Sequence, residues 1–217
     1  MEEVKSALPV VQISRLKRGF DILFSLFFLT ILSPFFILVL SLIFLEHLLT
    51  GQIFTSLFYV EKRISQGQPF DFVKFNIFQP RVIADMKKRE QFIYTKNLEH
   101  DGHSMTRVGK ILQKAYLDEL SQLFNILMGD ISVVGPRPVN LRVYEKELSR
   151  KNFTKQVIKT GLTGNYQSRK GLTELTQYEL DEEYIRYCVA NSSWKVLLFD
   201  LKIIARTIGV VFRAKGI

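Results

Sequence analysis

The stretch that decides the fold runs from Ile22 to Leu45 and reads ILFSLFFLTILSPFFILVLSLIFL. It contains no charged residue, and it is long enough for a helix that crosses a lipid bilayer. A cleaved signal peptide fits poorly, because the run is longer than a signal core and no small-residue cleavage site follows it. A fully buried helix of a soluble protein is the alternative to a membrane segment.

Ser33-Pro34 lies in the middle of this run and predicts a break. Proline removes one backbone N–H and clashes with the carbonyl four residues earlier, so the helix has to kink or end there. Each half has about 11–12 residues, and at about 1.5 Å per residue it is roughly 17 Å long. That length is near half of a ~30 Å hydrocarbon core. Two arrangements stay open: a re-entrant helix that returns to the same face, and a kinked helix that spans the bilayer.

The charged residues on either side of the run favour re-entry mildly. The basic residues are Arg15, Lys17 and Arg18 before the run, and Lys62 and Arg63 after it. Because cytoplasmic flanks carry the excess of Lys and Arg, two basic flanks give no reason to place the ends on opposite sides.

Composition narrows the class of protein. The chain has 217 residues with 30 Lys plus Arg against 21 Asp plus Glu, a formal net charge of +9. Cys188 is the only cysteine, so no disulfide forms within the chain, and three scattered histidines without a Cys-x-x-Cys pair exclude a Cys/His zinc cluster. The basic excess indicates an anionic partner: nucleic acid, an anionic lipid surface or a phosphorylated substrate.

The rest of the chain predicts a short hairpin followed mainly by helices. A loose alternation of apolar residues around Gly67 indicates the hairpin, and Gly129 ends the first long helical pattern. The expected elements are a hairpin over 58–80, a charged helix and loop over 81–105, helices over 106–128 and 140–158, and two tail helices over 174–190 and 194–213.

The last tail helix is amphipathic and basic. Ser192 or Ser193 can cap it, and its apolar residues share one side with lysines and arginines on or beside the other. Such a helix can lie in a membrane interface, or it can pack on the protein's own core as a surface helix. The apolar residues are Trp194, Leu197, Leu198, Leu201, Ile204, Ile208 and Val211.

Asp118 and Glu119 are the first candidate for chemistry. On a continuous helix Leu117, Leu120, Phe124 and Leu127 would face inward, and Asp118, Gln122 and Asn125 would form one polar stripe. Two adjacent carboxylates above an apolar stripe could bind Mg²⁺ and supply a nucleophile or base. The simpler interpretation of such a pair is a solvated helix face.

Two further groups carry cations. Gly135-Pro136-Arg137-Pro138 holds one guanidinium in a stiff turn, which suits a pair of phosphate oxygens, although an exposed Arg at a helix entry is the simpler interpretation. Glu61-Lys62-Arg63 together with Lys74 forms a basic cluster close behind the apolar run, which could contact lipid headgroups or a diphosphate.

Taken in order, these pieces resemble one family, the bacterial sugar transferases that act as polyprenyl-phosphate phosphoglycosyl transferases, in their small monotopic form. The resemblance covers roughly residues 15–216. The matching motifs are Lys17-Arg18-x-Phe20-Asp21, Ser33-Pro34, Phe58-Tyr59-x-x-x-Arg63 with Gly67, Phe70 and Lys74-Phe75, Thr106-Arg107-x-Gly109-Lys110, Leu117-Asp118-Glu119-Leu120-x-Gln122-Leu123-x-Asn125, Gly129-Asp130-x-Ser132-x-Val134-Gly135-Pro136-Arg137-Pro138, Gly161-Leu162-Thr163-Gly164, and the tail from Asp200-Leu201-Lys202 to Arg213-Ala214-Lys215-Gly216.

The resemblance implies an α-rich α+β fold in two parts. Residues 1–50 would hold a re-entrant membrane helix over about 22–49, broken at Ser33-Pro34, with both ends cytoplasmic. Residues 51–217 would form a small catalytic domain on the cytoplasmic face of the bacterial inner membrane, with interfacial C-terminal helices. A homo-oligomer stays open, and no recognisable nucleic-acid-binding motif is present.

The resemblance also implies a reaction. Asp118 would attack the β-phosphate of a UDP-sugar, form a covalent phosphosugar-aspartyl intermediate and release UMP, and polyprenyl phosphate would then take the phosphosugar. Mg²⁺ would bind at Asp118 and Glu119, with Glu119 as the supporting carboxylate. The substrate-binding residues would be Arg63, Lys74, Arg137, Gln122 and Asn125.

The chain departs from the family pattern near the presumed site. Asn76 and Gln113 stand where an Arg is usual, Val139 where a Glu is usual and Ser121 where a Pro is usual. The pattern after Gly164 is disturbed around Arg169 and Lys170, either of which could replace a missing cation in part. These changes leave open a catalytically weakened member that binds or partners others in glycan assembly.

Overall fold

The computed structural model describes residues 9–50, 56–89, 98, 103–114 and 117–213. The chain divides into two compact units. Unit 1 comprises Met1–Phe27, Glu61–Phe72 and Phe124–Ile217, and unit 2 comprises Phe28–Val60 and Val73–Leu123. The expected domain boundary between residues 50 and 51 adjoins a stretch outside the described residues and stays a prediction.

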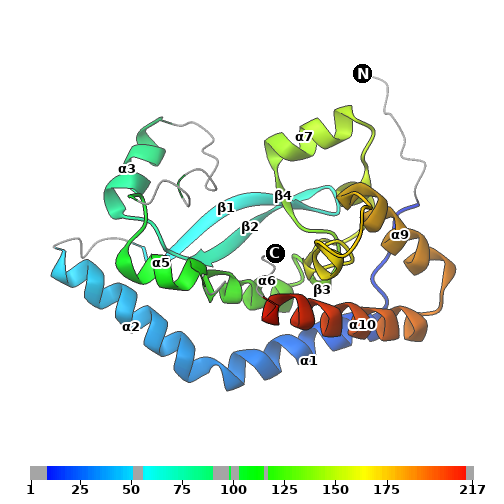
Figure 1. Cartoon of the computed structure of the whole chain (residues 1–217), viewed down its shortest axis with the longest axis horizontal. Coiled ribbons are helices and arrows are strands. Elements are labelled where there is room, and N and C mark those ends of the chain that lie inside the picture. Colours follow the sequence, from blue (N-terminus) through cyan, green and yellow to red (C-terminus); the bar gives the residue numbers. More distant parts are fainter. Residues whose placement is uncertain (1–8, 51–55, 90–97, 99–102, 115–116, 214–217) are drawn as a thin grey trace. The chain divides into compact units, whose positions relative to one another are not determined.

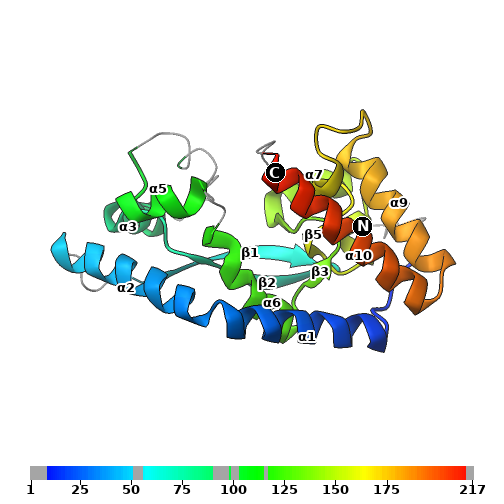
Figure 2. The ribbon, with the colours of Figure 1, turned by 60° about the horizontal axis from the view of Figure 1, so that its bottom comes forward.

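Two N-terminal helices, α1 (Arg15–Ile31) and α2 (Ser33–Leu49), take up the apolar run (Figures 1 and 2). They are bent by 62° at Leu32, with Pro34 in the first turn of α2, and the Ser33 hydroxyl donates to the carbonyl of Thr30 at 2.8 Å. In the described part of the chain no single helix is long and apolar enough to cross a membrane, whereas this bent pair qualifies by length and composition. The predicted break at Ser33-Pro34 is confirmed.

The predicted hairpin is also confirmed. Strands β1 (Phe58–Ser65) and β2 (Gln68–Phe75) are joined by Gln66 and Gly67, both with positive φ, which is typical of a tight type I′ turn (Figure 1). Strand β4 (Val139–Asn140) pairs antiparallel with β1 and completes a three-stranded sheet in the order β2-β1-β4.

Unit 2 has an aromatic core under α2. The Phe58 ring stacks on Phe75 of β2, and the Phe36 ring packs against Phe75 at a tilt of 55°. Helix α2 buries Val39 and Ile43 on the same side as Phe36. The unit also contains α3 (Pro80–Arg89), α5 (Arg107–Lys114) and the 3₁₀ helix η1 (Leu117–Ser121).

The expectation of one continuous helix over 106–128 is wrong. The segment consists of α5, η1 and then α6 (Gln122–Met128), with residues 115–116 outside the described part. The expected inward face is wrong as well, because Asp118, Gln122 and Asn125 are buried while Phe124 is 41% exposed. The buried Asp118 carboxylate and Asn125 amide have polar partners, which override the apolar periodicity.

Unit 1 is built on a second, parallel strand pair. β3 (Ser132–Val134) pairs with β5 (Gly161–Thr163), and the expected polar helix over 140–158 is interrupted, because Lys151 has a φ of 60° between α7 (Leu141–Ser149) and α8 (Thr154–Val157). A short 3₁₀ turn, η2 (Gln167–Arg169), follows β5.

The two predicted tail helices are present as α9 (Gln177–Ala190) and α10 (Ser193–Phe212). Ser192 is the N-cap residue of α10, although its side chain makes no capping hydrogen bond. Much of the apolar side of α10 is exposed rather than packed on the core, while Leu197 of the expected stripe is buried. The exposed members are Trp194, Leu198, Leu201, Ile208 and Val211.

Helix α1 is amphipathic with its polar side inward. Lys17, Asp21 and Ser25, spaced four residues apart, are buried, whereas Leu23 and Phe27 are exposed. An ordinary surface helix has the opposite arrangement. The polar side of α1 therefore needs partners for its charges inside unit 1.

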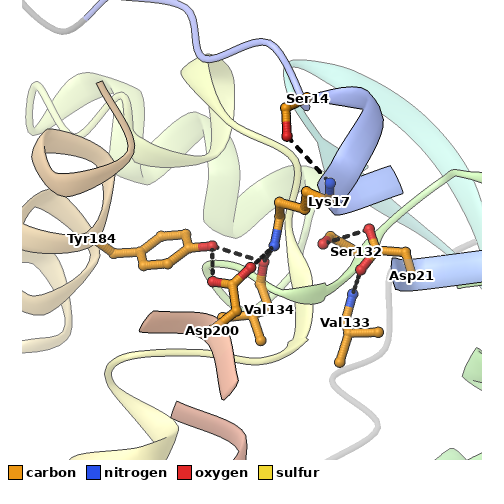
Figure 3. Close-up of polar contacts among 8 residues, drawn as sticks. All are labelled: Ser14, Lys17, Asp21, Ser132, Val133, Val134, Tyr184 and Asp200. Carbon is orange, nitrogen blue, oxygen red and sulfur yellow. Dashed lines mark hydrogen bonds and ion pairs between the residues drawn. The ribbon is translucent and has the colours of Figure 1, made fainter. Parts of the chain in front are cut away.

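Lys17 finds these partners on α10 and β3 (Figure 3). Its Nζ lies 2.5 Å from Oδ2 of Asp200 and donates to the carbonyl of Val134 at 3.0 Å. The Tyr184 hydroxyl donates to Oδ1 of Asp200 at 2.7 Å. Burial raises the pKa of Asp200, and the Lys17 ammonium opposes that rise and keeps the carboxylate paired.

Asp21 and Arg18 extend the same attachment. Asp21 accepts from the Ser132 hydroxyl at 2.8 Å and from the Val133 amide at 3.0 Å (Figure 3). Arg18 donates to the carbonyls of Ile126 and Leu127 in the last turn of α6. One turn of α1 thus fixes β3, α6 and α10 together.

We predict that Lys17→Met lowers the free energy of unfolding by about 3–5 kcal/mol, because the Asp200 carboxylate then stays buried without its cation. Denaturant unfolding of the purified protein in detergent, followed by circular dichroism, measures the change. The matched control is Lys62→Met, whose ion pair with Asp71 has side chains 67% and 59% exposed. That variant should lose less than about 1 kcal/mol.

Adding Asp200→Asn to Lys17→Met should recover part of the loss, because the amide oxygen still accepts from Tyr184 while the unpaired charge is gone. Equal losses in Lys17→Met and Lys62→Met would contradict the role of this ion pair.

Candidate active site

The adjacent acids Asp118 and Glu119 lie on η1, where the structure gives them a shared cation. Nζ of Lys74, on β2, lies 3.6 Å from Oδ2 of Asp118 and 3.2 Å from Oε1 of Glu119. The Asp118 side chain is 5% exposed, the Lys74 side chain 10% and the Glu119 side chain 18%. The pair is therefore a nearly buried cluster, and the interpretation of Asp118 and Glu119 as a solvated helix face is wrong.

Ser121 fastens η1 to the strand that carries Lys74. Its hydroxyl donates to the carbonyl of Val73 at 2.9 Å, one residue before Lys74. Because a 3₁₀ helix places residues three apart on the same side, Ser121 and Asp118 share a side of η1. The serine that stands in place of the family's usual Pro therefore helps to hold the acids against β2.

Asp118 and Glu119 place two like charges around the Lys74 ammonium. Neighbouring carboxylates in a site of low water content repel each other, and the Lys74 ammonium offsets part of that repulsion. A group that places new negative charge here, such as a diphosphate, needs further cationic stabilisation. The arrangement is suited to chemistry on a phosphorylated substrate.

The carboxylates of Asp118 and Glu119 fit a Mg²⁺ ion that takes its other ligands from water and from the substrate. Carboxylate oxygens are the ligands that Mg²⁺ prefers, and Asp118 and Glu119 already hold a cation, the Lys74 ammonium, between them. Over the described ranges no group of three or more His, Cys, Asp or Glu side chains is placed to hold a metal. Mg²⁺ commonly binds through one or two carboxylates and takes its other ligands from water and substrate phosphates.

Gln122 and Asn125 are both buried but differ in what they contact. Nε2 of Gln122, in unit 2, finds no hydrogen-bond partner among the residues that the structure describes. Nδ2 of Asn125, in unit 1, donates to the carbonyl of Asp71 at 2.7 Å and to Oδ2 of Asp130 at 2.8 Å. These contacts give Asn125 a structural role in the turn after α6.

In unit 1 the expected phosphate-binding Arg63 supports the Gly-Pro-Arg-Pro turn. Its Nη1 donates to the carbonyl of Pro138 at 2.9 Å, and its Nε donates to Oε1 of Glu61 at 2.6 Å. The guanidinium carbon also lies 4.2 Å from the centre of the Phe72 ring. Arg63 and Arg137 are thus brought to the same turn, with Arg63 holding its backbone.

The backbone of that turn is locked on its other side by β5. Gly135 N–H donates to the carbonyl of Thr163 and Gly161 N–H to that of Pro136, each at 2.8 Å. A Cβ on Gly135 would lie 2.5 Å from the Lys159 carbonyl oxygen, so only glycine permits this approach. Arg137 is half-buried on this rigid turn.

The residues that depart from the family pattern have ordinary structural roles. Asn76 is buried, donates to the carbonyl of Ser56 and accepts from the Phe78 amide. Val139 pairs with Ile64 in the β1–β4 ladder. Arg169 forms a two-bond pair with Glu183 at 3.0 Å, so it is engaged with α9.

Sequence reasoning missed the buried partners of α1. The signal was present, because Lys17, Asp21 and Ser25 repeat every four residues on one side of α1. The partners Ser132, Tyr184 and Asp200 lie more than a hundred residues later, and no local pattern connects them.

We predict that Lys74→Met destabilises the protein by about 1–3 kcal/mol, because Asp118 and Glu119 lose a shared cation. Adding Glu119→Gln should reduce that loss, since it removes one of the two like charges. Denaturant unfolding in detergent measures both variants, with Lys114→Met on the exposed end of α5 as the matched control. A double variant that loses as much as the sum of its parts would contradict this coupling.

Comparison with known proteins identifies the family of the chain. The family described as bacterial sugar transferase matches residues 12–214. The chain is 34% identical to the exopolysaccharide production protein ExoY of Sinorhizobium fredii, over 99% of this chain and 92% of that one. It is 31% identical to the uncharacterized sugar transferase EpsL of Bacillus subtilis, over 93% and 90% of the two chains.

A third relative carries a more specific name. The chain is 29% identical to the undecaprenyl-phosphate galactose phosphotransferase of Salmonella typhimurium, over 93% of this chain and 41% of that longer protein. The match of the family over nearly the whole length, together with the paired acids and the glycine-locked arginine turn, shows that the chain belongs to the bacterial sugar transferase family.

Proposed function

We propose that this sugar transferase moves a sugar 1-phosphate from a UDP-sugar to undecaprenyl or another polyprenyl phosphate, with release of UMP, as the first membrane step of surface glycan synthesis. The observation that carries the proposal is the buried cluster of Asp118, Glu119 and Lys74 in a chain of this family. The names of the Salmonella relative and of the Aeromonas hydrophila N-acetylgalactosamine phosphotransferase support the substrate class.

In the first half-reaction a carboxylate oxygen of Asp118 attacks the β-phosphorus of the UDP-sugar. The new O–P bond forms as the bond from that phosphorus to the bridging oxygen breaks, and UMP leaves with the bridging oxygen and its electron pair. In the second, an oxygen of the polyprenyl phosphate attacks the same phosphorus, and the bond to Asp118 breaks. The carboxylate is regenerated and the lipid carries the sugar diphosphate.

The neighbouring groups serve this attack electrostatically. Lys74 offsets the like charge between the carboxylate and the diphosphate, and Glu119 orients that ammonium. Bound at Asp118 and Glu119, Mg²⁺ would supply further charge stabilisation to the phosphate oxygens. Arg137, presented by the locked turn, is the phosphate-binding cation of unit 1, and Arg63 acts by holding that turn.

A lipid acceptor requires the site to lie at a membrane, and two features support that placement. The bent pair α1–α2 is apolar outside its packed side, with Leu23, Phe27, Ile37 and Leu49 exposed. The exposed apolar side of α10 is flanked by the exposed Lys195 and Lys202. We propose that α1–α2 is re-entrant in the inner membrane and that both units face the cytoplasm.

A non-catalytic binding or partner subunit is the second candidate. The observation that favours it is Asn76, a position where the family has an Arg, whose amide is used on neighbouring backbone groups. Such a subunit would bind a UDP-sugar or a polyprenyl phosphate without releasing UMP from any UDP-sugar.

We predict that membranes containing the protein release UMP from one or more members of a UDP-sugar panel when Mg²⁺ and undecaprenyl phosphate are supplied. Asp118→Asn should lower this release by at least ~10³-fold, because the amide cannot form the covalent intermediate. A coupled assay for UMP measures the rate, and Glu145→Gln on the exposed face of α7 is the control. Full activity of Asp118→Asn would refute the nucleophile, and binding without release by the wild type would favour the second candidate.

Re-entrant topology predicts that positions 5 and 150 lie on the same side of the membrane. Lys5→Cys and Arg150→Cys, each in a Cys188→Ser background, should react with a membrane-impermeant maleimide in inside-out vesicles. Neither should react in intact spheroplasts, while detergent should expose both. Labelling of the two positions from opposite sides would instead establish a kinked spanning helix.

A further inference from the structure

Glu46 is the first charged residue after the apolar run, and it contacts the helix that leads to the paired acids. Its Oε1 accepts from the Arg107 amide at 2.7 Å and its Oε2 from the Val108 amide at 3.0 Å. These amides belong to the first turn of α5, where no intrahelical acceptor exists for them. A carboxylate near the end of α2 thus caps the N-terminus of α5.

The cap is complete because Thr106 supplies the next acceptor. The Gly109 amide donates to Oγ1 of Thr106 at 2.9 Å, and the Lys110 amide begins the intrahelical pattern by donating to the carbonyl of Thr106. Glu46 therefore accepts hydrogen bonds from the Arg107 and Val108 amides, which Thr106 does not bind. Both of its bonds are charge-assisted, and a carboxylate at this end also interacts favourably with the helix dipole.

The N-terminal part of α5 also contacts the backbone of Ile77. The Thr106 amide donates to the carbonyl of Ile77 at 2.9 Å. A Cβ on Gly109 would lie 2.2 Å from the same Ile77 oxygen, so the backbones of α5 and of the segment after β2 touch directly. The helix packs on η1, which carries Asp118 and Glu119.

Helix α2 also packs beside Lys74, the cation of the acidic cluster. Phe36, one turn into α2, packs its ring against Phe75, the residue after Lys74. The N-terminal part of α2 thus contacts β2 beside Lys74, and Glu46 near its C-terminal end contacts α5, the helix that precedes η1. All of these residues belong to unit 2.

We propose that Glu46 is a positioning residue, which acts through α5 to hold the paired acids in register with the membrane helix α2. The inference rests on the proposed phosphoglycosyl transfer and adds to it the coupling between the lipid-facing helix and the nucleophile. A packing contact alone would need no charge, whereas two backbone donors aimed at one side chain need a forked acceptor.

The test compares Glu46→Ala, Glu46→Gln and Glu145→Ala in lipid nanodiscs of phosphatidylethanolamine and phosphatidylglycerol. Glu46→Ala should lower kcat for UMP release at least tenfold with the KM for UDP-sugar within twofold of wild type, because binding groups stay while the nucleophile is displaced. Glu46→Gln keeps one carbonyl oxygen as an acceptor, so its kcat should lie between those of Glu46→Ala and the wild type. Glu145→Ala, an exposed carboxylate of α7, should match the wild type.

A merely structural role would lower the folded fraction of Glu46→Ala, whereas a positioning role lowers kcat and leaves KM unchanged. Each variant is therefore also measured by size-exclusion chromatography and by hydrogen exchange. Exchange should rise at the Arg107 and Val108 amides and across residues 117–121 in Glu46→Ala, with the folded fraction unchanged. Unaltered kcat in Glu46→Ala, or a loss that follows the folded fraction alone, overturns the proposal.

The exchange measurement separates this proposal from the function it rests on. If the wild type releases no UMP, the proposed function fails and the exchange across 117–121 decides the role of Glu46. Faster exchange there in Glu46→Ala then supports the coupling, and unchanged exchange refutes it.

Discussion

The interaction on which unit 1 depends is the buried ion pair between Lys17 and Asp200. It lets α1 place a polar side inward and an apolar side outward, because the inward charges meet an opposite charge, the Val134 carbonyl and, at Asp21, the donors of Ser132 and Val133. A buried ion pair is weak evidence for net stability but can specify one arrangement among several. Here it specifies the register of α1 against β3, the strand that leads directly into the turn of Arg137. Helix α1 and the arginine turn are therefore fixed to each other by charged and polar contacts.

The same principle operates in unit 2 around Asp118. Burying two carboxylates costs free energy that an apolar pair would not, so the arrangement makes physical sense where the charge itself is used. Lys74, the Ser121 hydroxyl and the Glu46 cap on α5 all limit that cost or fix the elements involved. Each unit thus ties a helix of the apolar pair to its own core by polar contacts, through the buried Lys17 and Asp21 in α1 and through the half-buried Glu46 in α2. Helices α1 and α10 both leave apolar side chains exposed, among them Phe27 and Trp194.

The break at Ser33-Pro34, the hairpin at Gly67 and both tail helices were predicted from local sequence. Proline breaks a helix, glycine permits the positive φ of a tight turn, and apolar residues at helical spacing indicate a helix, so each signal lies within the element itself. Prediction from local sequence failed between 106 and 128. There the polar stripe of Asp118, Gln122 and Asn125 is the buried one. Asp118 and Asn125 have partners on β2 and at Asp130, which local sequence does not reveal. For the site, the paired acids and the arginine turn were identified by resemblance. That Lys74 would lie between the acids, and that Arg63 would support the turn, depended on strand pairing that the sequence does not display.

The internal ion pairs show which basic residues are available to an external anionic partner. Lys17, Lys155 and Lys74 are buried in internal ion pairs, while Arg63 and Arg169 pair with Glu61 and Glu183. These cations neutralise acids of the same chain, so the excess of positive charge resides in other residues. Lys195 and Lys202 are exposed beside the apolar side of α10, the position where an ammonium can reach an anionic headgroup while its neighbours enter the acyl region. Because Asp200 of that helix is the partner of Lys17, the ion pair that orients α1 also orients α10. Two helices with exposed apolar side chains, α1 and α10, are thus joined within unit 1 by one buried ion pair.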